Sequence, residues 1–526
     1  MKSIPVWLGM VISVTAANAQ VIGPDSSFGN NGLVVTAQQH KSSVIQGVAL
    51  QTDGRIVAAG MHYDNNQHSF ITRYLPDGTL DTGFGVQGMI SPVIGWNDGI
   101  NDVIVQSDGK ITVAGNEMQQ MSNPGGGIVL TSKPFLARFL PDGTPDLGFG
   151  VNGVHHLDIL DRYTNRQVVR IVQLPDGRLI AAGTSISGGP NEMILVGLFE
   201  DGSYDRSFAA NGLGRYQAAA GVDATLFDMT LQKDGKLVLA GISGTASLTA
   251  PANTRMAILN VMPNGSLNTA FGANGAVTLQ LSANAAPFDI ANAVKVLGNG
   301  KILAAGGASA KLALVQLHAD GSRDASFGLN GVVIDAARPV ADGIDVMASG
   351  AIMVTGVKAN TNPYSTDVSL SRFAASGSID ATFGTAGTLI IDQSAGDRAY
   401  ALLVQPDDKI VLAGHSEDPG TGNSSFTLWR LTNVATGPTG IKDPGSAGLR
   451  PVFYPNPTSG DMMLSFPQAP DQPLAISVVD IQGREVWYSK VTAQHTVLSL
   501  SGLSKGLYTA RLMAPGGVGV YKLVRR

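Results

Sequence analysis

The sequence of 526 residues has no cysteine, only 5 glutamates and 4 tryptophans, and a low charged fraction of 14%. The absence of cysteine excludes disulfides, thiol catalysis and cysteine metal sites. The net charge of −5 lacks the basic excess that a nucleic-acid partner requires. Glutamate favours helices, whereas aspartate and glycine favour turns. A chain with 35 aspartates and 65 glycines is therefore predicted to be all-β, built from many short strands, and not a helical bundle or an α/β enzyme.

The N-terminus has the pattern of a secretory signal peptide. Lys2 precedes a short apolar run, and Ala17 and Ala19 place small residues at the −3 and −1 positions before Gln20. The run is too short to span a bilayer, and no later apolar run reaches the roughly 18 residues that a spanning helix needs. We expect a signal peptide over residues 1–19 and a mature protein without a transmembrane segment.

Two phrases recur seven times along the chain. The first contains Phe-Gly or a close variant, returns at intervals of 56 to 65 residues, and has its phenylalanine at Phe28, Phe84, Phe149, Phe208, Phe271, Phe327 and Phe383. The second is an apolar run that ends in Gly60, Gly115, Gly183, Gly241, Gly306, Gly356 or Gly414. Each repeat carries four strand signals, which in the first repeat are Leu33–Thr36, Ile45–Gln51, Arg55–Ala59 and Phe70–Leu75. Seven four-stranded units predict a seven-bladed β-propeller over residues 20–433.

The ends of this region predict how the ring closes. The last repeat lacks the connector phrase that ends the others, whereas residues 24–32 carry a connector with no strand before it. We expect the N-terminal segment to dock on the last blade. The phrases resemble the delta-60 repeat family, which implies a propeller fold and brings no established activity.

Residues 434–526 differ in composition from the repeats. Residues 434–452 are rich in Gly, Pro, Ser and Thr and predict a flexible linker. Residues 453–526 contain about six short alternating runs and predict a small Ig-like β-sandwich. Its motif residues are Pro455, Asn456, Pro457, Gly460, Asp480, Gly483, Arg484, Leu503, Gly506, Tyr508 and Lys522.

These motif residues resemble the C-terminal sorting domain of type IX secretion substrates in Bacteroidota. The resemblance implies passage through the periplasm and across the outer membrane, with the type IX secretion machinery as a partner. It also implies a secreted or outer-membrane surface-attached location.

The polar residues of the repeat have structural and functional interpretations. Two aspartate series are expected to cap turns, with a Ca²⁺ site as the alternative; they are Asp77, Asp142, Asp201 and Asp320, and Asp81, Asp146, Asp205, Asp324 and Asp380. The repeated phenylalanines are expected to be core wedges between blades. The arginines at one strand position are expected to pair with connector aspartates, with anion binding as the alternative; they are Arg73, Arg138, Arg372 and Arg430.

No catalytic or cofactor motif is present, and the repeats show no blade in which Asp, Glu, His or Tyr concentrate at the channel. Loops on one face vary in length, at residues 116–133, 242–254 and 357–367. Trp96 is expected to be buried, with contact to a ligand as the alternative. The sequence thus indicates a non-catalytic surface scaffold that binds an extracellular ligand or protein partner. A hydrolase or lyase acting on extracellular polysaccharide and a purely structural surface protein are the alternatives.

Overall fold

The computed structural model describes most of the chain. The described residues are 21–36, 42–122, 128–158, 165–186, 189–245, 253–283, 287–360, 365–418, 420–434, 452–454, 458, 460–466, 469–470, 473–480, 485–500, 502–514 and 517–525. These residues form strands and turns, without a helix. The chain divides into two compact units, one of residues Ile22–Asn433 and one that includes Val434–Arg526.

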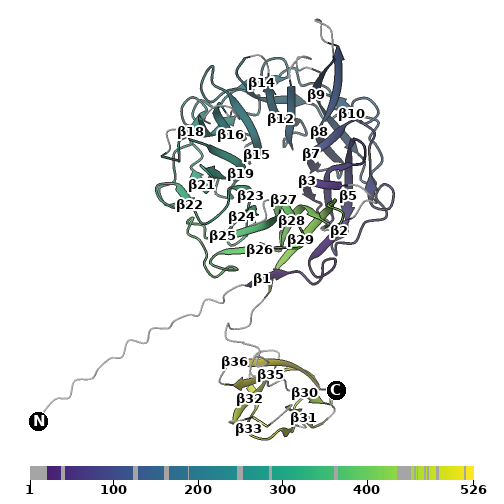
Figure 1. Ribbon diagram of the computed structural model, residues 1–526, viewed down its shortest axis with the longest axis vertical. Helices are drawn as coiled ribbons and strands as arrows, with labels where there is room; N and C mark the ends of the chain where they lie inside the picture. Colours follow the sequence, from purple (N-terminus) through teal and green to yellow (C-terminus); the bar gives the residue numbers. More distant parts are fainter. Residues whose placement is uncertain are drawn as a thin grey trace, which may run out of the picture. The chain divides into compact units, whose positions relative to one another are not determined.

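The first unit is a seven-bladed β-propeller, as the sequence predicts. Seven antiparallel sheets surround a central opening (Figure 1). The innermost strands are β3 (Ser42–Leu50), β7 (Asp98–Val105), β11 (Asn165–Gln173), β15 (Ala224–Leu231), β19 (Asp289–Val296), β23 (Ala341–Val346) and β27 (Asp397–Val404). The second strands are β4 (Ile56–Tyr63), β8 (Ile111–Ser122), β12 (Leu179–Ile186), β16 (Leu237–Thr245), β20 (Ile302–Ala308), β24 (Ile352–Ala359) and β28 (Ile410–Glu417).

The outer half of each blade completes the sheet. The third strands are β5 (Gln67–Tyr74), β9 (Ile128–Phe139), β13 (Glu192–Leu198), β17 (Asn253–Val261), β21 (Lys311–Leu317), β25 (Thr366–Phe373) and β29 (Ser424–Val434). The outermost strands of blades one to six are β6 (Met89–Ile90), β10 (Val154–His156), β14 (Leu213–Tyr216), β18 (Ala276–Leu279), β22 (Val332–Asp335) and β26 (Thr388–Ile391). Because a sheet cannot bury its own faces, the apolar core lies between neighbouring blades.

Blade seven is closed by the N-terminal segment, which confirms the docking expectation. Strand β2 (Leu33–Thr36) pairs antiparallel with β29, with Leu33 opposite Trp429, and β1 (Val21–Pro24) also joins this sheet (Figure 1). The assignment of Leu33–Thr36 to the first blade is therefore wrong. The sequence repeat is offset from the blade by one strand, because the outermost strand hydrogen-bonds to the sheet that precedes its own repeat.

The repeated phenylalanines are core wedges, as predicted. All seven are at most 1% exposed. Phe84 packs against the next connector, where a Cβ added to Gly143 would lie 3.0 Å from its ring. The same connector accepts a backbone hydrogen bond of 2.8 Å from Gly85 N to Asp142 O. The phrase thus joins neighbouring blades, and equivalent bonds are donated by the backbone N–H groups of Gly29, Gly150, Ala209, Gly272 and Gly328.

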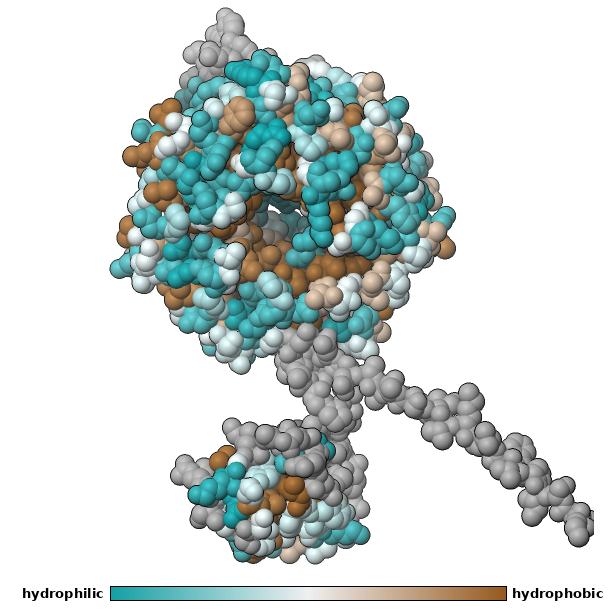
Figure 2. All heavy atoms as spheres, turned by 180° about the vertical axis from the view of Figure 1, so that it is seen from behind, coloured by the Kyte–Doolittle hydropathy of each residue, from teal (hydrophilic) through white to brown (hydrophobic). Residues whose placement is uncertain are grey.

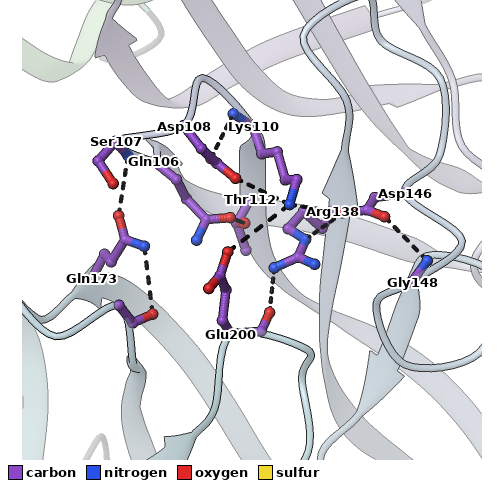
Figure 3. Close-up of polar contacts among 11 residues, drawn as sticks. Gln106, Ser107, Asp108, Lys110, Thr112, Arg138, Asp146, Gly148, Gln173 and Glu200 are labelled. Carbon is purple, nitrogen blue, oxygen red and sulfur yellow. Dashed lines mark hydrogen bonds and ion pairs between the residues drawn. The ribbon is translucent and has the colours of Figure 1, made fainter.

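The arginines pair with connector aspartates, which confirms that interpretation. Arg138 Nε lies 2.8 Å from Asp146 Oδ2 (Figure 3). Its guanidinium carbon lies 4.6 Å from the centroid of the Phe149 ring. The guanidinium also donates to the carbonyl oxygen of Glu200 in blade three. Arg73, Arg372 and Arg430 make the same 2.8 Å contact with Asp81, Asp380 and Asp25. We call this arrangement the arginine clamp.

The longest hairpin belongs to blade two. Residues 116–133 were expected to form a variable loop, but most of them continue β8 and β9, which pair from Ile111↔Phe139 to Ser122↔Ile128. Residues 242–254 and 357–367 likewise contain the extended ends of strand pairs. In blade two, the described part of residues 116–133 therefore lies in strands.

The second unit contains two sheets around one core. A three-stranded sheet comprises β30 (Val452–Tyr454), β31 (Met462–Ser465) and β34 (His495–Leu498). A four-stranded sheet comprises β32 (Leu474–Val479), β33 (Glu485–Val491), β35 (Gly506–Ala514) and β36 (Gly517–Arg525). Ile476, Leu498 and Leu512 are fully buried in the shared core. This is the small β-sandwich that the sequence predicts.

Candidate functional site at the channel mouth

Every innermost strand carries a β-bulge at the same place. In β3 the register with β4 shifts between Ile45 and Gly47, so Gln46 is the extra residue. The repeat glycines make this possible, because a Cβ on Gly60 would overlap the carbonyl oxygen of Val44. The corresponding glycine of every other blade also faces the carbonyl oxygen of an inner strand closely. The second repeated phrase therefore fixes the bulge.

The bulges place seven side chains around one cavity. The extra residues are Gln46, Asn101, Val169, Phe227, Asn292, Asp342 and Tyr400, and all seven line the same hollow of about 370 Å³. The opening of the ring is visible in Figure 2, where hydrophilic and hydrophobic residues both border it. Arg170 and Arg398 complete the lining. We call this hollow the channel mouth.

One side of the channel mouth is an ordered ionic network. Arg170 Nε lies 2.6 Å from Asp228 Oδ1, and Asp228 Oδ2 accepts a hydrogen bond of 2.7 Å from Val294 N. Asp102 Oδ2 accepts a bond of 2.9 Å from Ile171 N. Burial raises the pKa of Asp102 to about 6, although the charge of Arg170 opposes this shift. These carboxylates join inner strands of neighbouring blades.

The opposite side carries groups with fewer protein contacts. Arg398 NH2 lies 3.7 Å from Asp342 Oδ2, and its guanidinium carbon lies 4.7 Å from the centroid of the Tyr400 ring. Burial raises the pKa of Asp342 and of Tyr400, with Arg398 acting against both shifts. The ring of His415 lies 5.7 Å from that of Tyr400, and burial lowers the pKa of this histidine. A carboxyl, a phenol and a guanidinium thus face one cavity.

Sequence reasoning missed this site. The seven bulge residues comprise six residue types, so no repeated phrase marks them, and Asp342 and Tyr400 come from two different blades. A signal was nevertheless available, since each bulge residue lies 14 residues before its repeat glycine, as Gln46 does before Gly60.

The aspartates of the repeat act in turns, as predicted. Asp77 Oδ1 accepts hydrogen bonds from Thr79 N at 2.9 Å and Thr79 Oγ1 at 2.7 Å. Asp146 Oδ1 accepts a bond of 3.1 Å from Gly148 N (Figure 3). Across the described ranges, no group of three or more acidic or histidine side chains is arranged to hold a metal ion. These contacts give the carboxylates a structural role in shaping the connectors.

The remaining site residues predicted from the sequence lie in the propeller, in the sandwich or outside the described residues. Trp96 is 47% exposed, so the expectation that it is buried is wrong. Tyr508, in the sandwich, donates a hydrogen bond of 2.8 Å to Ser504 O. Gly460, Asp480, Leu503 and Gly506 are also among the described residues, as is the backbone of Lys522 in β36. Ala17, Ala19, Gln20, Pro455, Asn456, Pro457, Gly483 and Arg484 lie outside the described residues.

Two family models match the chain. A secretion system C-terminal sorting domain matches residues 452–526. A β-propeller domain of unknown function (DUF5122) matches residues 51–84, 174–208 and 297–327. The chain is thus a β-propeller protein with a type IX sorting tail. It is exported to a secreted or cell-surface location, and the tail implies interaction with the secretion machinery. Neither description names a catalytic activity.

Three solved structures are similar to the chain at low identity. PorZ, described as a surface component of the type IX secretion system of Porphyromonas gingivalis, is 11% identical with a TM-score of 0.36. The match covers 91% of this chain and 59% of that one, so the chain spans less than two thirds of PorZ. The polysaccharide lyase Uly1 is 10% identical, with coverages of 74% and 90% and a TM-score of 0.43.

A protein from Lactobacillus plantarum is 13% identical, with coverages of 69% and 89% and a TM-score of 0.40. No curated protein matches the sequence. In the described part of the chain, no helix has the length and apolar character needed to cross a membrane.

Proposed function

We propose that this protein is a non-catalytic surface binding protein whose channel mouth holds a small, uncharged, polyhydroxylated ligand. The observation that carries the proposal is the contrast between constant and varied positions. The connectors and repeat glycines recur because they build the ring, whereas the seven bulge residues differ and converge on one cavity. Folding as a propeller does not require different residue types at the bulge positions. The variety of these residues therefore supports a role in recognition.

The chemistry of the channel mouth suits hydroxyl groups. Gln46, Asp342 and Arg398 supply amide, carboxyl and guanidinium groups, and the rings of Phe227 and Tyr400 supply flat apolar surface. The volume of about 370 Å³ is within the range of small-molecule sites. Both arginines have carboxylate neighbours, so the lining offers no concentrated charge for a strongly ionic ligand.

The second candidate function is hydrolysis or lyase cleavage of a polysaccharide. The observation that favours it is Asp342, whose pKa is raised by burial beside the phenol of Tyr400. A carboxylic acid with a raised pKa can act as a general acid. We prefer binding because seven blades enclose the channel mouth, and because the volume of this cavity suits one or two sugar units and not a polymer.

Binding can be tested with the full chain, a panel of neutral mono- and disaccharides, and titration calorimetry. We expect at least one sugar to bind wild type and Tyr400→Ala to weaken that binding about fivefold, since a stacked aromatic group contributes about 1 kcal/mol. Leu329→Ser is the matched control, because Leu329 is 86% exposed in a connector. Absence of binding across the panel, or unchanged binding by Tyr400→Ala, contradicts the proposal. New reducing or unsaturated ends released from polysaccharides would instead establish catalysis.

A further inference from the structure

A second concave surface lies on blade two and shares no residue with the channel mouth. Trp96 lies in the loop that precedes β7, and it lines an open depression of about 550 Å³ with Gly95, Glu117, Met118, Gln119 and Gln120. We call this surface the Trp96 depression. An exposed indole is uncommon where packing alone sets the sequence, because tryptophan is normally largely buried.

The loop that carries the indole is held in place. Gly95 N donates to Asp98 Oδ2 at 3.0 Å, and Met118 N donates to Asn97 O at 2.8 Å. Asn97 Oδ1 accepts a further bond of 3.0 Å from Gln67 N in blade one. The backbone on both sides of the indole is therefore fixed before any ligand arrives, which lowers the entropic cost of binding.

A carboxyl group lies beside the indole. Glu117 is 6% exposed, and it approaches the loop so closely that a Cβ on Gly95 would collide with its Oε2. Gln119 Nε2 donates to Glu117 Oε1 at 2.7 Å, and His156 Nδ1 lies 3.3 Å from the same oxygen. The carboxyl orientation is thus set by its neighbours. The depression combines one aromatic face with amide and carboxyl groups.

We propose that the Trp96 depression binds an internal stretch of an uncharged glycan chain. An indole stacks on the apolar face of a sugar ring, while amide and carboxyl groups hydrogen-bond to its hydroxyls. No lysine or arginine is among the six lining residues, and the nearby Lys133, opposite Glu117 on β9, lies 3.1 Å from Asp158, so the lining itself offers no cation to phosphate, sulfate or uronate groups. The depression is open to solvent, so a bound sugar need not be the end of a chain. This site is independent of the ligand proposed for the channel mouth.

The test uses the full chain on an array of neutral, sulfated and uronate-containing hexasaccharides, followed by titration of the best ligand. We expect neutral hexasaccharides to bind, Trp96→Ala to weaken binding about tenfold, and Trp96→Phe to recover part of the loss. Val93→Ser is the control, because Val93 is 94% exposed in the same segment. Equal melting temperatures of all variants exclude a folding defect as the cause.

Three results would overturn the inference. One is the absence of any neutral hexasaccharide that binds wild type, and another is binding confined to sulfated or uronate chains. The third is full binding by Trp96→Ala. The variant Arg398→Ala separates the two sites, because it alters the channel mouth only and should leave hexasaccharide binding unchanged. Loss of that binding in Arg398→Ala would place the sugar in the channel and contradict a site at Trp96.

Discussion

Removing the arginine clamp of blade seven should open the ring where its two ends meet. Arg430 Nε lies 2.8 Å from Asp25 Oδ2, and its NH1 donates to Pro76 O at 2.6 Å. Both partners of the ion pair are buried. Burial alone would raise the pKa of Asp25, but hydrogen bonds from Ser27 and the nearby positive charges of Arg430 and a lysine hold it at about 2.

The expected loss for Arg430→Ala is about 3 kcal/mol. Breaking a buried ion pair by removing one partner costs roughly 3–5 kcal/mol. The lower value applies because Lys409 Nζ, 3.3 Å from Asp25 Oδ2, still compensates the carboxylate. A propeller of roughly 400 residues has an unfolding entropy of about 0.8 kcal/mol per kelvin if it unfolds as one unit. The melting temperature should therefore fall by about 4 °C in differential scanning calorimetry.

The matched control is Arg138→Ala in blade two. Arg138 has the same contacts with Asp146, and Lys110 lies 3.7 Å from that carboxylate. Both variants should lose similar stability, but hydrogen exchange should differ. Only Arg430→Ala should accelerate exchange in strand β2, because no short connector links β2 to β29 as one links β9 to β10. Equal exchange in the two variants, or an unchanged melting temperature for Arg430→Ala, would refute this reasoning.

Four further outcomes are expected. Gly183→Ala should destabilise the propeller by about 3 kcal/mol or more, because its Cβ would overlap the carbonyl oxygen of Gln167. In urea denaturation, Gly298→Ala should change stability by less than about 0.5 kcal/mol, since open space surrounds that position. Hydrogen bonds from a lysine and a serine lower the pKa of Asp324 to about 2. The stability that this carboxylate contributes to the folded state is therefore present above pH 4 and lost towards pH 2. Melting temperatures should fall over that interval, and they should fall less steeply in Asp324→Asn than in wild type. Removal of residues 453–526 should leave folded propeller in the periplasm of the native host, as measured by fractionation.

The sequence predicts those features that depend on local spacing. The connector phrase specifies a turn, a buried phenylalanine and a link to the next blade within a few residues, so counting phrases counts blades. The unmatched connector at residues 24–32 likewise predicts ring closure. The offset of the blade from the repeat could not be predicted, because it depends on which sheet accepts a strand such as Leu33–Thr36.

The channel mouth could not be recognised by residue type. A bulge is set by strand register and by the space above a glycine, so Gln46 and Tyr400 occupy equivalent positions without chemical likeness. The exposure of Trp96 was unpredictable for a different reason. An aromatic residue in a loop can pack inward or outward, and the backbone bonds that decide this come from β5 and β8, distant in the sequence.

The pairing of β2 with β29 also bears on how the protein folds. Leu33 and Trp429 are direct partners, so this pair of strands cannot form until nearly the whole propeller has been synthesised. Until then β2 has no strand to pair with, and an unpaired strand is prone to aggregate. Contacts this distant in sequence form slowly. The sheet of blade seven can therefore be completed only after β29 has been synthesised.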